Sequence, residues 1–138
     1  MTMDYDEAAE LIKKHEGFRD RVYLDSENIP TCGYGHALIV GSYVPHYIAD
    51  SFFHNDFKNA IADYGYFNFN VDSVRRAVIL SMLFNLGRDR FAGFRKMIKA
   101  LYDKDYERAA IEMFDSKWFR QVGSRAEELI KMMRTGEI

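Results

Sequence analysis

Three residues able to handle protons lie close together near the start of the chain: Glu16, Asp25 and Thr31. They belong to the stretch HEGFRDRVYLDSENIPTCGYGHAL, residues 15–38, which is polar, contains three glycines and has few core-forming residues. Acetal hydrolysis needs one carboxyl that donates a proton and another that stays ionised. A neighbouring hydroxyl can orient the attacking water. This spacing also arises by chance, and polar hairpins are commonly solvated surface, so the pattern alone does not name an enzyme.

Periodicity predicts the elements that hold these residues. Apolar side chains at i, i+3, i+4 and i+7 indicate a helix from about residue 4 or 6 to 15, and Gly17 is suited to end it. Glu16 would then stand at the helix C-terminus. Residues 18–38 alternate and contain turn residues, which predicts two or three short antiparallel strands. Glu16 would lie at a helix end and Asp25 at the end of a strand beside a turn, so the two carboxyls would have unlike surroundings.

The rest of the chain is predicted to be helical. An apolar stripe runs from Pro45 to about residue 64. The segment VDSVRRAVILSMLFNLG is apolar nearly all round over residues 77–86, as in a helix buried on most sides, and Gly87 would end it. Shorter amphipathic segments lie at about 92–102, 106–114 and 123–134.

These elements predict an α+β, mainly α fold, with a small β-hairpin lobe and a helical lobe around a central buried helix. We expect one domain over residues 1–138. Residues 15–64 would form the α+β lobe, and residues 1–14 and 71–138 the helical lobe. Because clefts form where unlike lobes meet, the polar hairpin is a candidate cleft wall.

Composition limits the classes of function. The single cysteine, Cys32, excludes an internal disulfide and is interpreted as a small buried residue. Zinc motifs are absent and the four histidines are scattered, so no metal or other cofactor is expected. No signal peptide or membrane-spanning stretch occurs, which predicts that the protein stays in the cytoplasm unless other machinery releases it.

Charge is unevenly distributed along the chain. Residues 1–70 carry 5 basic and 11 acidic side chains, whereas residues 71–138 carry 14 and 10. A basic C-terminal half could attract a polyanion, either nucleic acid or an anionic wall polymer, or could solvate helix faces. The basic residues are spread over several predicted helices without a recognition motif, so nucleic-acid binding is not expected.

The run LIKKHEGFRDRVYLDSENIPTCGYGHAL resembles the T-even-phage lysozymes, a family of endolysin muramidases. In that family a Glu at the end of the first helix is followed by an Asp, a Thr and a Gly-x-Gly-His, matched here by Glu16, Asp25, Thr31 and residues 33–36. The resemblance continues through DSVRRAVILSMLFNLG, FAGF and SKWFRQVGSRAEELIKMMRTGE. It covers nearly the whole chain in order and implies a lysozyme-like fold.

The resemblance implies a role for each matching residue. Glu16 would protonate the glycosidic oxygen of peptidoglycan. Asp25 and Thr31 would hold the water that attacks the N-acetylmuramic acid carbon from the opposite face, with inversion. Arg125 would form an ion pair with Glu16, and His36 would pair with Asp56.

Two further residues, Phe84 and Asn85, match substrate-contacting positions of the family's central helix. An aromatic core residue and a satisfied buried amide are the alternative interpretations. The family also implies a monomer that acts on peptidoglycan glycan strands without a stable membrane association. It would stay in the host bacterial cytoplasm until it is released to the cell wall, and would depend on a holin-like permeabilising protein if phage-encoded.

Three departures qualify the resemblance. The segment between His36 and Asp56 is shorter than in well-known members, the sequence stops at RTGEI without a final helical extension, and the net charge of −2 contrasts with the basic charge of many members. The alternatives left open are a lytic transglycosylase, which needs only the acid, and a non-catalytic peptidoglycan-binding module.

Overall fold

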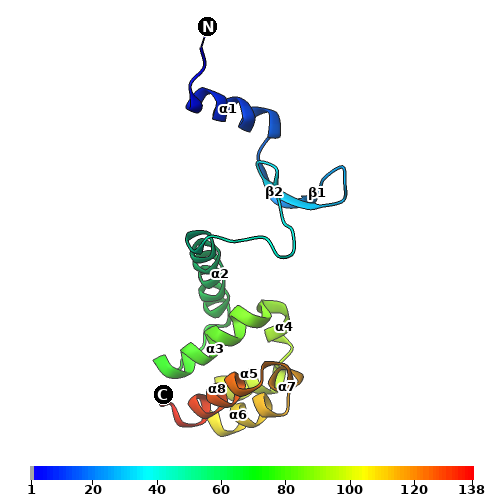
Figure 1. Cartoon of the computed structure of the whole chain (residues 1–138). Helices are drawn as coiled ribbons and strands as arrows, with labels where there is room; N and C mark the ends of the chain where they lie inside the picture. Colours follow the sequence, from blue (N-terminus) through cyan, green and yellow to red (C-terminus); the bar gives the residue numbers. More distant parts are fainter. Residues whose placement is uncertain (1) are drawn as a thin grey trace. The chain divides into compact units, whose positions relative to one another are not determined.

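The computed structural model describes residues 2–138, which form eight helices and one three-stranded sheet (Figure 1). The chain divides into two compact units, Met1–Pro45 and His46–Ile138. The first contains one helix and the sheet, and the second contains only helices. The predicted α+β, mainly α class is therefore confirmed. The division into lobes expected from the sequence stays a prediction.

The first helix, α1 (Tyr5–Glu16), begins and ends with strong local signals. The side chain of Asp4 accepts a hydrogen bond from the Glu7 backbone N–H at 2.8 Å, and the Glu7 side chain accepts one from the Asp4 N–H at 3.0 Å. This reciprocal capping box satisfies two amides that have no partner within the helix. Gly17, at φ +73°, ends the helix as predicted, so Glu16 is its last residue.

The sheet is antiparallel, in the order β1 (Arg19–Leu24), β2 (Pro30–Gly33) and β3 (His36–Ala37). Thr31 lies opposite Tyr23 on one side and Ala37 on the other. The β1–β2 register is irregular between Arg19 and Tyr23. The prediction of two or three short antiparallel strands is confirmed, with β2 as the central strand.

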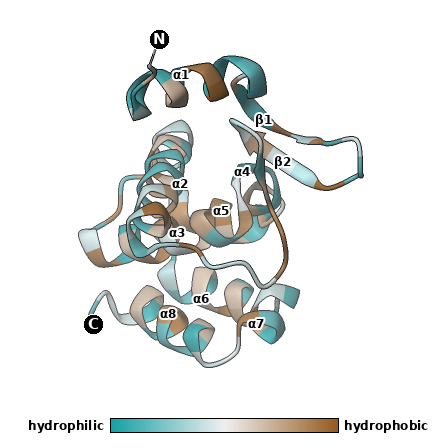
Figure 2. Cartoon of the chain, turned by 45° about the horizontal axis from the view of Figure 1, so that its top comes forward, coloured by the Kyte–Doolittle hydropathy of each residue, from teal (hydrophilic) through white to brown (hydrophobic). Residues whose placement is uncertain are grey.

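The second unit contains the hydrophobic core. Central helix α3 contributes Val78, Ile79 and Met82, each 0% exposed, and hydrophobic stretches (brown) also occur on α5 and α8 in Figure 2. Asp72 caps α3, and Gly87 ends it where the sequence predicts. The helices of this unit are α2 (His46–Phe67), α3 (Ser73–Leu86), α4 (Arg88–Ala92), α5 (Arg95–Tyr102), α6 (Tyr106–Phe114), α7 (Lys117–Val122) and α8 (Ser124–Thr135).

Two details differ from the expected helices. The segment expected at about 92–102 instead contains the end of α4 and all of α5, with Gly93 and Phe94 between them. Helix α7 was not predicted, because six residues are too few to display a helical period. Ser116 caps α7 by accepting a hydrogen bond from the Phe119 N–H at 3.2 Å.

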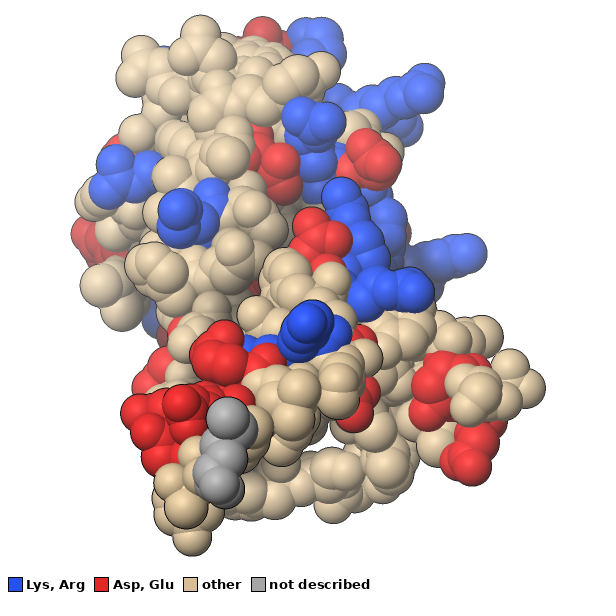
Figure 3. Space-filling view, turned by 90° about the horizontal axis from the view of Figure 1, so that it is seen from above, with Lys and Arg blue, Asp and Glu red and all other residues tan. Residues whose placement is uncertain are grey.

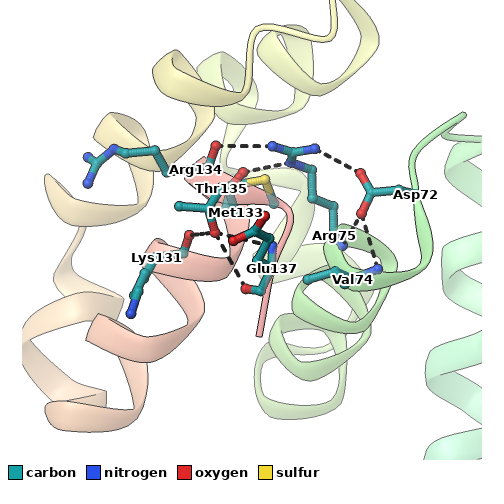
Figure 4. Close-up of polar contacts among 8 residues, drawn as sticks. All are labelled: Asp72, Val74, Arg75, Lys131, Met133, Arg134, Thr135 and Glu137. Carbon is teal, nitrogen blue, oxygen red and sulfur yellow. Dashed lines mark hydrogen bonds and ion pairs between the residues drawn. The ribbon is translucent and has the colours of Figure 1, made fainter.

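Arg75 joins the start of α3 to the end of α8 (Figure 4). Its guanidinium donates to the backbone carbonyls of Met133 at 2.7 Å and Arg134 at 3.0 Å. It also pairs with the Asp72 carboxylate at 2.9 Å. Because the last carbonyls of a helix have no partner within it, Arg75 satisfies two groups that would otherwise rely on water. None of the helices formed by residues 2–138 is long and apolar enough to cross a membrane.

Candidate functional site

Glu16 lies against the turn that joins β2 to β3. A Cβ atom placed on Gly35 would stand 2.6 Å from Glu16 Oε2, which is closer than Cβ atoms in proteins approach a non-bonded neighbour. Gly35 also has φ +75°, a conformation that side chains disfavour. The carboxylate of Glu16 therefore occupies space that is open only because residue 35 is a glycine.

Tyr34, in the same turn, contacts the end of α1 on two sides. Its ring centroid lies 5.4 Å from that of Phe18, and Lys13 Nζ lies 5.5 Å from the Tyr34 centroid. Aromatic and cation–π contacts of this kind each contribute up to about 1 kcal/mol at exposed positions. The helix that ends in Glu16 is thus held next to the β2–β3 turn.

Asp25 organises the turn between β1 and β2. Its Oδ1 atom accepts hydrogen bonds from the backbone N–H groups of Glu27 at 2.8 Å and Ile29 at 2.9 Å. This closes a tight turn in which Asn28 adopts φ +63°. Oδ2 accepts no hydrogen bond from the protein residues that the structure describes, so one oxygen shapes the loop while the other keeps its lone pairs.

Thr31, on β2, is 3% exposed, and its hydroxyl donates to the carbonyl of Ile29 at 2.8 Å. A threonine hydroxyl has one proton and two lone pairs, so this bond leaves Oγ1 able to accept. The Asp25 N–H donates to Ile29 O at 3.0 Å, and Tyr23 lies opposite Thr31. Since side chains alternate along strands, Asp25 and Thr31 project from the same face of the hairpin.

The three predicted catalytic residues are thus distributed along β2. Glu16 lies by the turn that follows Gly33, and Asp25 lies in the turn that precedes Pro30. Thr31 lies between them. A four-residue strand such as β2 spans about 10 Å, so Glu16 and Asp25 lie near the two ends of a short strand. All three belong to the first unit.

The supporting residues fall in both units. His36 begins β3 opposite Cys32, whereas Asp56 lies on α2. Arg125 lies in the first turn of α8. His36 belongs to the unit that contains Glu16, and Asp56 and Arg125 belong to the other. The His36–Asp56 and Glu16–Arg125 ion pairs stay predictions.

Phe84 and Asn85 lie at the end of α3 and differ in surroundings. The Phe84 ring lies 5.4 Å from that of Phe53 and is not among the buried core residues. Asn85 and Arg125 line a polar hollow of about 480 Å³, together with Arg90 and Gln121. The structure thus places two of the predicted residues, Asn85 and Arg125, at the same hollow. Arg90 and Gln121 were missed, because nothing in their local sequence separates them from ordinary surface residues.

A larger hollow of about 700 Å³ shares Arg90 and Gln121 with the first. Its lining includes Trp118, the one tryptophan of the chain, which is 3% exposed. Within residues 2–138 there is no group of three His, Cys, Asp or Glu side chains able to hold a metal ion. The carboxyl groups of Glu16 and Asp25 in the first unit are suited to acid–base chemistry. The arginines that line the two hollows of the second unit are suited to binding anions.

Comparison with known proteins identifies relatives. The family described as phage lysozyme matches residues 13–135. Two Dictyostelium discoideum proteins named probable T4-type lysozyme 2 and 1 are 32% and 30% identical over 69 residues, 50% of this chain and 41% of theirs. The pre-baseplate central spike protein Gp5 of Enterobacteria phage T4 is 27% identical over 94% of this chain and 28% of its own length. The aligned part of the chain thus spans about two fifths of each Dictyostelium protein.

Proposed function

Because the chain belongs to the phage lysozyme family, we propose that it hydrolyses the β-1,4 bond between N-acetylmuramic acid and N-acetylglucosamine in peptidoglycan. The observation that carries the proposal is the placement of Glu16, Asp25 and Thr31 around one short strand. The reaction is general acid–base hydrolysis with inversion at the sugar carbon.

Glu16 acts as the general acid. Its carboxyl protonates the glycosidic oxygen as the bond to the muramic acid carbon breaks, which avoids expulsion of a bare alkoxide. Residue 35 has no side chain that would displace the carboxyl, and Glu16 is exposed at the end of α1, so the group is accessible to a sugar.

Asp25 and Thr31 hold the attacking water. The water donates one hydrogen bond to the free Asp25 Oδ2 and one to Thr31 Oγ1, which aims its lone pair at the sugar carbon. As the new C–O bond forms, the Asp25 carboxylate accepts the proton that the water loses. Inverting glycosidases keep their carboxyls about 6.5–9.5 Å apart to leave room for this water. Placement of the two groups near opposite ends of β2 supports that arrangement.

The supporting residues complete the proposal. Arg125 pairs with Glu16, His36 pairs with Asp56, and Phe84 and Asn85 contact the glycan. The protein works as a monomer without a cofactor, degrades the bacterial cell wall and causes lysis. In a phage it reaches its substrate after a holin-like protein has permeabilised the membrane.

The first test replaces the acid. Glu16→Gln keeps the size of the side chain and removes the transferable proton, and we expect the release of reducing ends from purified peptidoglycan to fall about 10²–10⁴-fold. The matched control is Glu10→Gln, a change to an exposed glutamate on the same helix, which forms an ion pair with Lys13 at 3.6 Å. Equal rates for Glu16→Gln and the wild type would contradict the assignment.

The second test separates hydrolysis from transglycosylation. A lytic transglycosylase needs only the acid and forms anhydromuramyl ends, whereas the proposed reaction adds one water to each cleaved bond. Asp25→Asn keeps an oxygen that can accept the two turn hydrogen bonds but loses the charge. We expect reducing ends labelled by ¹⁸O-water from the wild type and almost none from Asp25→Asn. Anhydro products in the mass spectrum would favour the transglycosylase, and binding without turnover would favour a non-catalytic module.

A further inference from the structure

Thr31 is the one buried residue among residues 2–45, at 3% exposed, although the sheet that holds it has only three strands. Its side chain is flanked on the same face of the sheet by Tyr23 on β1, Ala37 on β3 and Gly33 two positions along β2. Glycine has no side chain, and alanine has a single methyl group. Tyr23 is therefore the flanking residue with enough bulk to cover Thr31.

An irregularity of β1 brings Arg19 next to Tyr23. These two residues are the β1 partners of Gly33 and Thr31. Between the two pairs β1 has three residues where β2 has one, which is the pattern of a β-bulge. Because residues two positions apart on β2 are separated by about 7 Å, Arg19 and Tyr23 lie about that close, whereas four regular strand positions span about 13 Å.

The guanidinium of Arg19 lies over the Tyr23 ring, with its Cζ atom 4.3 Å from the ring centroid. Lys and Arg side chains also form a contiguous group on the face shown in Figure 3. Arg19 differs from a solvated surface cation because it rests on an aromatic ring, and it forms no ion pair with the residues that the structure describes. Tyr23 is the one residue of β1 that is not exposed. Its ring is thus covered by a cation.

Asp25 lies on the same face as this pair. Its N–H donates to the carbonyl of Ile29 at 3.0 Å, which continues the pairing of β1 with β2. Since Asp25 stands two positions after Tyr23, the two side chains project to the same side. Asp25 Oδ2 and Thr31 Oγ1 are the atoms that the proposed function assigns to the attacking water. The Tyr23 ring therefore borders the place that this water would occupy.

We propose that Tyr23 is a positioning residue for the attacking water and that Arg19 fixes its ring. The ring forms a wall beside Thr31, which confines the water to the gap between Thr31 Oγ1 and Asp25 Oδ2 and keeps larger nucleophiles out. The water then attacks the sugar carbon, and its proton passes to the Asp25 carboxylate. This inference rests on the proposed function, because Tyr23 acts through Thr31 on the water of the same reaction.

The first measurement is the release of reducing ends from purified peptidoglycan by the full chain. Tyr23→Ala removes the wall, and we expect kcat to fall about 10–100-fold while KM stays within about 2-fold, since a loosely held water is seldom aligned. Tyr23→Phe keeps the ring and should restore kcat to within about 3-fold of the wild type. Arg19→Gln frees the ring and should lower kcat by about 2–5-fold. This variant keeps every residue that flanks Thr31, so it tests the inference even if Tyr23→Ala does not fold.

The second measurement reports on the water itself. Methanol can replace water as the nucleophile, in which case its oxygen bonds to the sugar carbon, its proton passes to Asp25 and a methyl glycoside forms. In a fixed mixture of methanol and water, Tyr23→Ala should raise the ratio of methyl glycoside to reducing ends at least about 3-fold above the wild type, because the opened site admits the larger nucleophile. Loss of stability alone would lower both products equally. Mass spectrometry measures the ratio.

The matched control is Leu24→Ala, a change to the next residue of β1, which is 62% exposed and projects from the opposite face. It should keep the kcat and the product ratio of the wild type. Equal kcat for Tyr23→Ala and Leu24→Ala, or an unchanged product ratio, would overturn the inference and leave the proposed function in place. A rise in KM at constant kcat would overturn it too, by making Tyr23 a sugar contact. A wild type without Glu16-dependent cleavage would remove the proposed function and this inference with it.

Discussion

At the scale of single residues, the position of the Glu16 carboxylate depends on the glycine at residue 35. The carboxylate fills the space where a side chain at residue 35 would project, and the positive φ of this residue already favours glycine. Gly35 is therefore a positioning residue for Glu16. Its contribution can be separated from backbone strain, because Gly33 in the same hairpin also has positive φ but would meet nothing within 4 Å.

We predict that Gly35→Ala and Gly33→Ala each lower the free energy of unfolding by about 1–2 kcal/mol, because both force an L-residue into a left-handed conformation. Only Gly35→Ala should also lower kcat on peptidoglycan, by at least about 10-fold, since its methyl group displaces the acid. Denaturant titration and initial rates measure the two effects. Equal activity of the two variants would contradict the role of Gly35.

The residue types were predictable from the sequence, but several of their contacts were not. Glu16, Asp25 and Thr31 stand in one short segment whose turns and strands are locally determined, so the sequence could name them as candidates, and the family resemblance supplied their expected roles. The contact with Gly35 depends on where α1 ends relative to the sheet. Asn85 and Arg125 are 40 positions apart, and only the packing of the second unit brings them to one hollow.

At the scale of elements, Arg75 connects two helices that are far apart in the sequence. Its guanidinium donates two hydrogen bonds to carbonyls at the end of α8. The same group pairs with Asp72 at the start of α3. The Arg75 guanidinium also lies 3.7 Å from the ring of Tyr106 on α6. Loss of this side chain should therefore loosen more than one helix contact.

Arg75→Met keeps an apolar stem that reaches about as far as Nε of arginine, and removes the donors. We expect it to lower the free energy of unfolding by about 1–3 kcal/mol, since two carbonyls and one carboxylate lose their partner. Lys131→Met, on the exposed side of α8, should change it by less than about 0.5 kcal/mol. Urea unfolding of the two variants provides the comparison, and a loss as small as that of Lys131→Met would show that water replaces Arg75.

Asp72 makes this connection sensitive to pH. Burial raises the pKa of its carboxyl, but hydrogen bonds from the Arg75 backbone and guanidinium, with the guanidinium charge, outweigh burial and hold the pKa below the ordinary 3.8. A lowered pKa in the folded state stabilises the protein above pH 3.8, and this contribution is lost as the pH falls through the folded pKa.

We therefore expect the wild type to be more stable than Asp72→Asn at pH 6, and the difference to shrink as the pH is lowered below 3.8. The asparagine keeps an oxygen for the Val74 and Arg75 amides, so the comparison isolates the charge. Thermal unfolding at a series of pH values measures it. The effect is modest because 42% of the Asp72 side chain is exposed. A constant difference between pH 6 and pH 2 would contradict this explanation.

Longer elements were predicted better than short ones. The 14 residues of α3 display a full apolar pattern and end at a glycine, and their prediction was nearly correct. The six residues of α7 bury Trp118 and little else, so their local pattern is weak. Helix α7 depends on its Ser116 cap and on packing against neighbours, which a window of sequence does not reveal. The hollow lined by this helix was therefore also missed.

At the scale of the whole molecule, the buried hydrophobic core lies entirely within the second unit. Every residue of this core falls between Ala60 and Met133. Among residues 2–45, Thr31 alone is buried, and it is polar. Because hydrophobic burial is the main source of folding free energy, most of the stability of the protein should come from the second unit.

We predict that a fragment of residues 46–138 keeps its helical circular dichroism and unfolds cooperatively. Dispersed amide signals in its NMR spectrum would support this, and a fragment of residues 1–45 serves as the comparison and should show no cooperative transition. A molten 46–138 fragment would instead agree with the sequence-based division, in which residues 1–14 belong to the helical lobe.

The observed turn contacts of the Asp25 carboxylate, together with the catalytic role proposed for it, constrain which substitutions this position can accept during evolution. One oxygen closes a loop through the Glu27 and Ile29 amides, so a descendant that no longer needed the reaction would still lose a well-formed hairpin on replacing Asp25 with an alanine. Asparagine would preserve the loop without the charge. Inactive descendants should therefore carry asparagine at this position more often than aliphatic residues, and a retained aspartate would be weaker evidence of activity than a retained Glu16.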